Sequence, residues 1–203
     1  MYIGKPGDES IFLYIPNILE YSDILGLELW LNTVKFITGT AKNGALVKRK
    51  QVWYQEDEKY FCEKWLYRYP RWKGHIYPKV LKKIELTMKK IITDINMSED
   101  LPIVLNDKIN SCLVNLYENG NDKISRHKDS SDSFGNIPTI VNLSIGQTRI
   151  LRLINNEETI DFPLEHNSLF IMAGSSQKNY THEIIEDKTI TKKRYSLTFR
   201  ELL

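Results

Sequence analysis

Four histidines occur in the chain, at positions 75, 127, 166 and 182, and one of them stands two residues before a carboxylate. If His127 and Asp129 lie on a β-strand, their side chains share one face, because residues i and i+2 of a strand point the same way. His182 lies in a strand-like run at 180–184 and could add a second imidazole from a later strand. Two imidazoles and one carboxylate leave open positions suited to Fe(II) and its substrates. A His-x-Asp triplet is also common in surface loops, so the spacing alone leaves both interpretations open.

Two arginines near the end of the chain have a spacing that fits anion binding. Arg194 and Arg200 are six residues apart, so an extended chain puts both on one face, with Ser196 and Thr198 between them. The apolar residues of this segment would take the opposite face. Buried guanidinium groups are costly unless they meet an anion, and arginine binds carboxylates in a bidentate manner, so a dicarboxylate fits. An outer-face pair engaged in salt bridges is the alternative.

The middle of the chain combines positive charge with aromatic rings. Residues 35–83 hold thirteen Lys and Arg against four Asp and Glu, whereas the whole chain has a net charge of only +2. The same stretch contains Trp53, Tyr54 and a cluster from Trp65 to Trp72. Because Lys and Arg neutralise phosphates and planar rings stack on bases, this composition suits a nucleic-acid surface. A solvated basic face over aromatic residues that only pack is the alternative.

These residues must be positioned by secondary structure. Apolar residues at helical spacing predict helices over 17–34 and 77–95, and a short strand is expected from residue 10 to Pro16. Residues 36–46 contain two glycines and predict a loop or hairpin. Beyond them, β-rich segments separated by turn residues predict strands at 113–117, 139–145, 149–154, 158–162, 168–172, 180–185 and 195–199. Short strands at close spacing are typical of a sandwich, jelly roll or barrel.

Length and composition exclude several classes of protein. The chain has 203 residues, of which 41% are hydrophobic and 27% charged, so we expect one folded domain, 1–203, not a disordered or fibrous chain. No apolar run approaches the roughly 18 residues of a membrane span, and from the first residues we expect no secretory signal. Cys62 and Cys112 are too few for a disulfide framework. We expect an intracellular monomer, in the cytoplasm or nucleus, with no membrane partner.

Taken together, these motifs resemble the AlkB family of Fe(II)- and 2-oxoglutarate-dependent dioxygenases. The resemblance rests on motifs in the same order and at the same spacing, namely Asn115-Leu116-Tyr117, His127-x-Asp129, the run from Ser168 to Gly174, His182, and Arg194 through Arg200. It implies an α+β, mainly β protein with a double-stranded β-helix, or jelly roll, as its core. This core would comprise residues 111–203. Residues 1–110 would form an N-terminal extension of buttressing helices and a nucleotide-recognition lid over 36–72.

The resemblance also implies roles for individual residues. The iron ligands would be His127, Asp129 and His182. The residues that bind the cosubstrate 2-oxoglutarate would be Asn115, Tyr117, Arg194, Ser196, Thr198 and Arg200. Arg194 would pair with the distal carboxylate, and Arg200 would lie near the metal-side carboxylate or the aspartate ligand. Ser196 stands where the family often has Asn. The substrate contacts would be Arg49, Gln51, Tyr54 and Asp132, the last in place of acidic residues that follow the metal aspartate in DNA-repair members.

The activity implied by the resemblance is oxidative demethylation of alkylated nucleobases. With Fe(II) and O2, 2-oxoglutarate would be converted to succinate and CO2 while an N-methyl group is hydroxylated and leaves as formaldehyde. The target would be N1-methyladenine or N3-methylcytosine in DNA, with RNA as a second candidate, extruded from the base stack. The same chemistry on an RNA modification or a protein side chain is one alternative. A jelly-roll binding module without catalysis is another, although the triad and both arginines are present.

Overall fold

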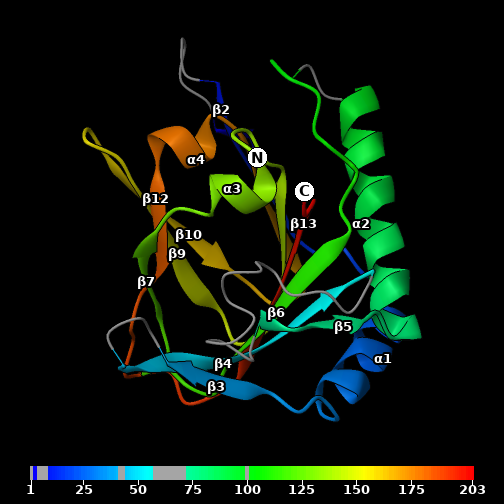
Figure 1. The fold of residues 1–203 in the computed structure, drawn as a ribbon, viewed down its shortest axis with the longest axis vertical. Coiled ribbons are helices and arrows are strands. Elements are labelled where there is room, and N and C mark those ends of the chain that lie inside the picture. The colour runs from blue at the N-terminus through cyan, green and yellow to red at the C-terminus, as the bar shows by residue number, and fades with distance from the viewer. Residues whose placement is uncertain (1, 4–8, 41–43, 57–71, 99–100) are drawn as a thin grey trace.

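The computed structural model describes residues 2–3, 9–40, 44–56, 72–98 and 101–203 (Figure 1). Most of the aromatic cluster that begins at Trp65 lies outside the described residues, as does Cys62. Within the described ranges, the strands form two sheets, one large and one small.

Strands from both halves of the chain make up the large sheet. Its order is β1 (Tyr2–Ile3), β2 (Ser10–Ile15), β11 (Ser168–Gly174), β8 (Ile140–Gly146), β13 (Arg194–Arg200), β6 (Ser111–Tyr117), β4 (Leu46–Gln55) and β3 (Ile37–Thr40). A short strand, β5 (Gly74–Ile76), pairs in parallel with β4. The N-terminal region therefore adds strands to both edges of the sheet. The strand expected from residue 10 is present as β2, whereas the length of β4 beyond residue 46 and the strand β5 were not expected.

The small sheet carries the metal-site candidates. Its order in the described chain is β10 (Thr159–Leu164), β9 (Arg149–Ile154), β12 (Thr181–Ile184) and β7 (Ile124–His127), all antiparallel. Two short helices, α3 (Ser131–Phe134) and α4 (Ser176–Asn179), follow β7 and β11. The expected mainly β, jelly-roll architecture is confirmed.

Two longer helices cover one face of the large sheet, α1 (Tyr21–Leu31) and α2 (Lys79–Ser98) (Figure 1). Strand alternation divides the apolar residues between the two faces of this sheet. Leu13 and Leu197 belong to the core under the helices, whereas Phe12 and Phe170 belong to the core that includes residues of the small sheet. Burying such side chains contributes about 1.5–3 kcal/mol each, which holds both layers against the large sheet.

The expected elements differ from the observed ones mainly at their ends. The first helix begins at Tyr21, not at residue 17, because Asn17 has a φ of 54° and Asn167 binds the backbone N–H and C=O of Leu19 through its side chain. The second helix begins after Pro78 and runs to Ser98. Among the described helices, none combines the length and apolar character that a bilayer crossing requires.

Candidate functional site

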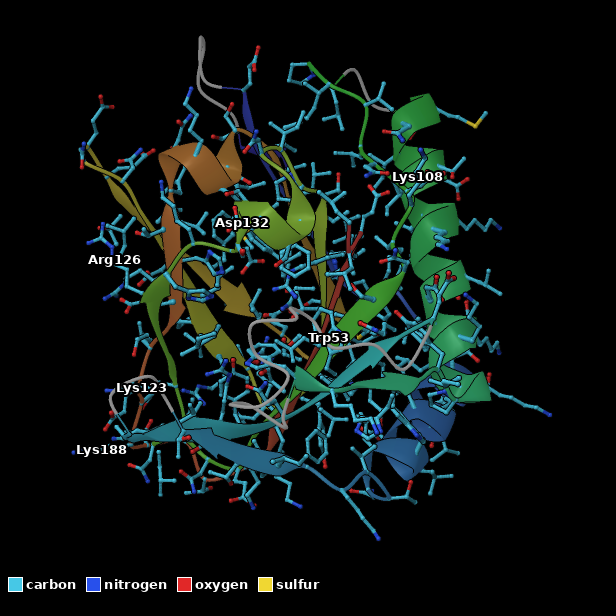
Figure 2. The ribbon with its side chains drawn as sticks, in the orientation of Figure 1. Trp53, Lys108, Lys123, Arg126, Asp132 and Lys188 are labelled. Atoms are coloured by element: carbon cyan, nitrogen blue, oxygen red, sulfur yellow. The ribbon has the colours of Figure 1, made fainter. Side chains whose placement is uncertain are left out.

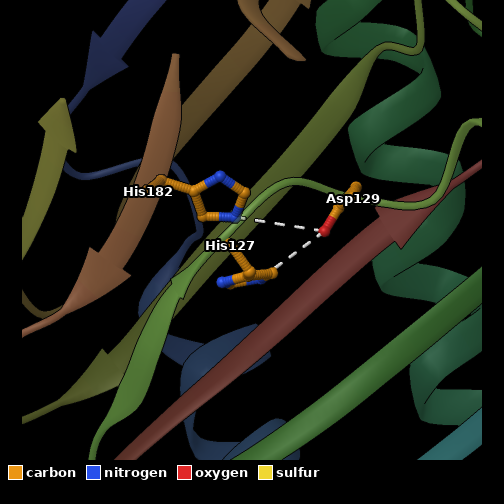
Figure 3. Close-up of side chains that lie close together, drawn as sticks. All are labelled: His127, Asp129 and His182. Carbon is orange, nitrogen blue, oxygen red and sulfur yellow. Dashed lines mark ion pairs between the residues drawn. The ribbon is translucent and has the colours of Figure 1, made fainter. Parts of the chain in front are cut away.

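The two candidate metal-binding histidines lie opposite each other on neighbouring strands of the small sheet. In the β7–β12 pairing His182 faces His127, and their ring centroids are 4.2 Å apart. Asp129 follows two residues later, and its Oδ1 lies 3.7 Å from Nε2 of His127 and 3.9 Å from Nε2 of His182 (Figure 3). The three ligand atoms all lie within 4.8 Å of one another, so a single ion could contact all of them.

The protonation of the two imidazoles suits a metal site. Nδ1 of His127 lies 2.9 Å from the carbonyl oxygen of Ser125, and because a carbonyl can only accept, Nδ1 carries the hydrogen and Nε2 keeps its lone pair. Burial lowers the pKa of His182 to about 3, and it also lowers the pKa of His127. Both rings are therefore neutral near pH 7, which is the form that binds a metal ion.

Asp129 is held in its ionised form by a neighbouring cation. Nε of Arg200 donates to Oδ2 of Asp129 at 2.6 Å, and the backbone N–H of Asp129 donates to Oε1 of Gln177 at 2.9 Å. Burial alone would raise the pKa of Asp129, but the charge and hydrogen bond of Arg200 and the two neighbouring histidines together outweigh burial, and the net shift is downward. Oδ1 is the carboxylate oxygen that remains directed at the two histidines.

A cavity of about 650 Å³ opens beside this triad. One part of its wall is aromatic and contains Trp53, Trp72 and Phe134. Another part is cationic and contains Lys48, Arg49, Lys123, Arg126 and Lys128. Figure 2 shows Trp53, Lys123 and Arg126 among the side chains around this region. The volume lies in the range of small-molecule sites.

The sequence of this chain matches a known protein family. Residues 12–200 match the family described as the 2OG-Fe(II) oxygenase superfamily. The chain belongs to this superfamily. The name of this superfamily implies Fe(II) as the metal and 2-oxoglutarate as the cosubstrate. The site fits this metal, because two imidazoles and one carboxylate form the facial triad that Fe(II) oxygenases use. The His127, Asp129 and His182 side chains are the ones that could hold the ion.

Relatives within the 2OG-Fe(II) oxygenase superfamily carry AlkB names. The "Alpha-ketoglutarate-dependent dioxygenase alkB homolog 3" of Bos taurus and that of Homo sapiens are each 33% identical over 102 residues, which is 45% of this chain and 36% of the relative. The "DNA oxidative demethylase ALKBH2" of Arabidopsis thaliana is 26% identical over 121 residues, 47% of this chain and 38% of the relative. The chain thus matches little more than a third of these relatives' length. The expected membership of the AlkB family is confirmed.

Solved structures share the fold of this chain. "The structure of OsALKBH1" matches with a TM-score of 0.68 at 16% identity, covering 94% of this chain and 97% of that one. A prolyl hydroxylase from Trichoplax adhaerens, in complex with a hypoxia inducible factor oxygen degradation domain peptide fragment, matches with a TM-score of 0.61 at 18% identity. It covers 94% of this chain and 83% of that one.

The residues expected to bind 2-oxoglutarate lie on β6 and β13 and are brought together. The members that line the cavity are Asn115, Tyr117, Ser196, Thr198 and Arg200. Arg194 is 1% exposed, its guanidinium carbon lies 5.2 Å from the centroid of the Tyr117 ring, and its Nε donates to Oγ of Ser144 at 2.9 Å. Burial lowers the pKa of Arg194 to about 10.

One nitrogen of the Arg194 guanidinium is free to bind an anionic group. Nη1 of Arg194 is buried and has no hydrogen-bond partner among the described residues. The charged or polar neighbours that shift the pKa of this guanidinium are Tyr117 and Arg149, and neither is a carboxylate. An unpaired donor on a buried cation is costly, and a carboxylate would satisfy both the donor and the charge. The residues present therefore fit a dicarboxylate cosubstrate.

The four expected substrate contacts are not all at the cavity. Arg49 lines it, and its Nε donates to Oδ1 of Asn115 at 2.8 Å. Gln51 shares this face of β4 but is 1% exposed and does not line the cavity, and neither of its amide atoms has a partner among the described residues. Asp132 is exposed on α3 and does not line the cavity.

Tyr54 is placed away from the cavity by strand alternation. It lies an odd number of residues from Arg49, so the two side chains point to opposite faces of β4. The Tyr54 ring packs 5.5 Å from the ring of Trp30, centroid to centroid, in the core under the helices. The side chain that β4 does place in the cavity wall near this position is Trp53.

Several site residues were not expected from the sequence. Asn142 on β8 lines the cavity, and Ser144 binds Arg194. The sequence does mark both residues: they are polar, stand at i and i+2 in an otherwise apolar strand, and so share one face of it. Arg149 is also buried, 5.4 Å from the Tyr117 ring, and donates to the carbonyl oxygens of residues 119, 122 and 185.

Proposed function

We propose that this chain is an Fe(II)- and 2-oxoglutarate-dependent dioxygenase that removes methyl groups from the ring nitrogens of nucleobases in DNA, with RNA as a second substrate class. The observation that carries the proposal is one cavity that joins a His-Asp-His triad, an aromatic wall and a cationic wall. The names of the relatives, two dioxygenases and a DNA oxidative demethylase, support the same substrate class.

The aromatic wall supports recognition of a base. The Trp53 ring lies 6.1 Å from that of Trp72 and 6.3 Å from that of Phe134, centroid to centroid. Stacking on such rings is worth about 1–3 kcal/mol per base, and a base that carries a positive charge after methylation gains cation–π attraction as well. This gain offsets part of the few kcal/mol that extrusion of a base costs.

The cationic wall supports recognition of a phosphate backbone. Of the acidic residues described, Asp129 alone lines the cavity, and Arg200 pairs with it. Lys48 and Lys123 are both paired with Glu186, whereas Arg126 donates to a hydroxyl group, that of Thr181. Lysine and arginine around a cavity attract a polyanion and release its counterions, so binding to an oligonucleotide should weaken as salt rises.

Different residues of the chain would bind the metal and orient the base. When bound, Fe(II) with 2-oxoglutarate and O2 supplies the oxidising chemistry, in which a methyl group is hydroxylated and 2-oxoglutarate becomes succinate and CO2. The neutral imidazoles of His127 and His182 and the carboxylate of Asp129 would hold the metal. The aromatic wall would orient the base and exclude water from the methyl group.

The test is methyl removal from matched DNA and RNA oligonucleotides that carry N1-methyladenine or N3-methylcytosine, followed by mass spectrometry. With Fe(II) and 2-oxoglutarate, we expect the loss of one methyl mass, and a His127→Ala variant should lose this activity. Succinate formation without loss of the methyl group from any of these oligonucleotides would overturn the nucleobase assignment and direct the search to other substrates. We also propose that the protein acts as a monomer inside the cell; light scattering after size exclusion tests the first part.

A further inference from the structure

Asn142 is, with Ser144, one of two polar residues in the largely apolar strand β8. β8 reads Ile-Val-Asn-Leu-Ser-Ile-Gly, and most of these residues are buried. Asn142 pairs in register with Thr198 of β13 and lines the cavity. Neither the triad nor the aromatic wall involves its side chain.

The side-chain amide of Asn142 connects three residues of β13. Its Nδ2 lies 2.8 Å from Oγ of Ser196 and 3.0 Å from Oγ1 of Thr198, and its Oδ1 lies 3.4 Å from Nη2 of Arg194. The orientation of the amide follows from this neighbour. A guanidinium can only donate, so Oδ1 must face Arg194, and the NH2 group must then face the two hydroxyls.

This orientation decides which way the two hydroxyl groups can donate. Because Ser196 and Thr198 each accept a hydrogen from Asn142, neither can give its own hydrogen to that amide. The contact between the two hydroxyls, at 3.3 Å, uses only one of the two hydrogens. At least one hydroxyl hydrogen therefore remains for another acceptor.

Ser196 and Thr198 both line the cavity, so this hydrogen can be donated into it. Arg194 does not line the cavity, but its buried Nη1 is a second donor without a partner among the described residues. Arg194, Ser196 and Thr198 project from the same face of β13. Hydroxyl and guanidinium donors on one face of a strand form a site for an anionic oxygen acceptor.

We propose that Asn142 is a positioning residue for the cosubstrate: it holds Ser196 and Thr198 as hydrogen-bond donors and aligns Arg194, so that the three together bind the distal carboxylate of 2-oxoglutarate. This inference rests on the proposed function and deepens it, because it identifies the residue that sets the polarity of the cosubstrate site. Asn142 acts through its neighbours and does not need to touch the reacting atoms.

The first test replaces the amide by a carboxylate. In Asn142→Asp, the new side chain can only accept, so it would take the hydroxyl hydrogens and neutralise Arg194. Calorimetric titration of 2-oxoglutarate into Zn(II)-loaded protein, which performs no redox chemistry, should show affinity at least about tenfold weaker than in the wild type. Asn156→Asp makes the same change of charge at an exposed turn and should bind 2-oxoglutarate as the wild type does.

The second test exchanges two side chains that already touch. Asn142→Ser should weaken binding, because the hydroxyls lose their shared donor. The double variant Asn142→Ser, Ser196→Asn keeps one amide and one hydroxyl in the pair and should recover affinity to within about threefold of the wild type. Zn(II) affinity should stay unchanged in every variant, and the KM for 2-oxoglutarate should rise with little change in kcat. A role limited to folding would produce neither this rescue nor this split.

Two results would overturn the inference, and they differ in what else they overturn. If Zn(II)-loaded wild type does not bind 2-oxoglutarate, the proposed function fails together with the inference. If the wild type binds it and Asn142→Asp binds equally well, the inference alone fails. Thermal unfolding of each variant shows whether it is folded; should Asn142→Asp not fold, failure of the exchanged pair to recover the affinity lost in Asn142→Ser would overturn the inference.

Discussion

Arg200 and Asp129 form a buried ion pair that links the two sheets at the metal-site candidate. Nε of Arg200 lies 2.6 Å from Oδ2 of Asp129, and their side chains are 8% and 7% exposed. Arg200 belongs to β13 of the large sheet, whereas Asp129 follows β7 of the small sheet. The pair therefore fixes the position of the carboxylate relative to both histidines and keeps it ionised.

Removing the cation from this pair should destabilise the metal-free protein strongly. Arg200→Met leaves the buried Asp129 carboxylate without its partner, and we expect the free energy of unfolding to fall by about 3–5 kcal/mol. Added Zn(II) should reduce the loss, because the metal replaces the missing positive charge. Urea unfolding with EDTA and with Zn(II) measures both values.

The control for this prediction is an exposed pair with similar geometry. Nε of Arg152 lies 2.7 Å from Oδ1 of Asp161 in the small sheet, and the two side chains are 35% and 42% exposed. Arg152→Met should cost less than about 1 kcal/mol, since exposed ion pairs contribute little. Equal losses in the two variants would contradict a special role for the buried pair.

Loss of one histidine should remove tight metal binding. His182→Ala deletes one of three expected ligands, and we expect the affinity for Zn(II) or Fe(II) to fall by at least about a hundredfold, since the loss of an outer partner alone costs up to that much. His75→Ala is the matched control, because His75 is exposed on β5 and away from the triad. Isothermal titration of metal-free protein makes the comparison, and unchanged affinity in His182→Ala would rule this residue out as a ligand.

The positions of these residues could be predicted wherever one strand carries the whole pattern. Arg194 and Arg200 were expected on one face of the last strand, and the structure places both there, with Leu197 in the opposite core. His127 and Asp129 were also expected on one strand, but β7 ends at His127 and Asp129 follows it; the two side chains still converge because only one residue separates them. The role of His182 could not be predicted from local spacing, because it lies on a second strand; it was implied by the order of the family motifs.

Contacts between strands could not be predicted in this way. The first six residues of β4 include three basic ones, so no apolar alternation marks it as a strand and the side on which Tyr54 lies was not evident. The partners of Asn142 on β13 depend on the register between β8 and β13, which are separated by about fifty residues. Local sequence carries little information on such a register.

The buried histidines should make the metal-free protein sensitive to acid. Burial lowers the pKa of His182 from 6.5 to about 3, so below pH 6.5 the unfolded chain binds a proton that the folded one does not. The free energy of unfolding should therefore fall as the pH falls from 6.5 to 4.5, by at most about 1.4 kcal/mol per pH unit for this group. His127 adds to the effect, since burial lowers its pKa too.

Urea unfolding in EDTA at several pH values between 4.5 and 6.5 measures this slope. His182→Asn carries no titrating ring at this position and should give a shallower slope than the wild type. Carboxylates contribute little in this range because their ordinary pKa values lie near or below its lower limit. An identical slope in wild type and variant would show that His182 titrates normally in the folded protein.

Substitutions of Trp53 and Tyr54, which lie on opposite faces of β4, should affect substrate binding and core packing separately. Trp53→Leu removes the 1% exposed ring that supports Trp72 and Phe134 in the cavity wall. Because stacking on a base is worth about 1–3 kcal/mol, loss of this support should raise the KM for a methylated oligonucleotide about fivefold or more. Tyr54→Leu removes a ring from the core under the helices and should lower stability while leaving this KM unchanged. Steady-state assays of methyl removal, with thermal unfolding of both variants, make the comparison. The opposite result, a raised KM in Tyr54→Leu alone, would place the base on the other face of the strand and contradict the role of the aromatic wall.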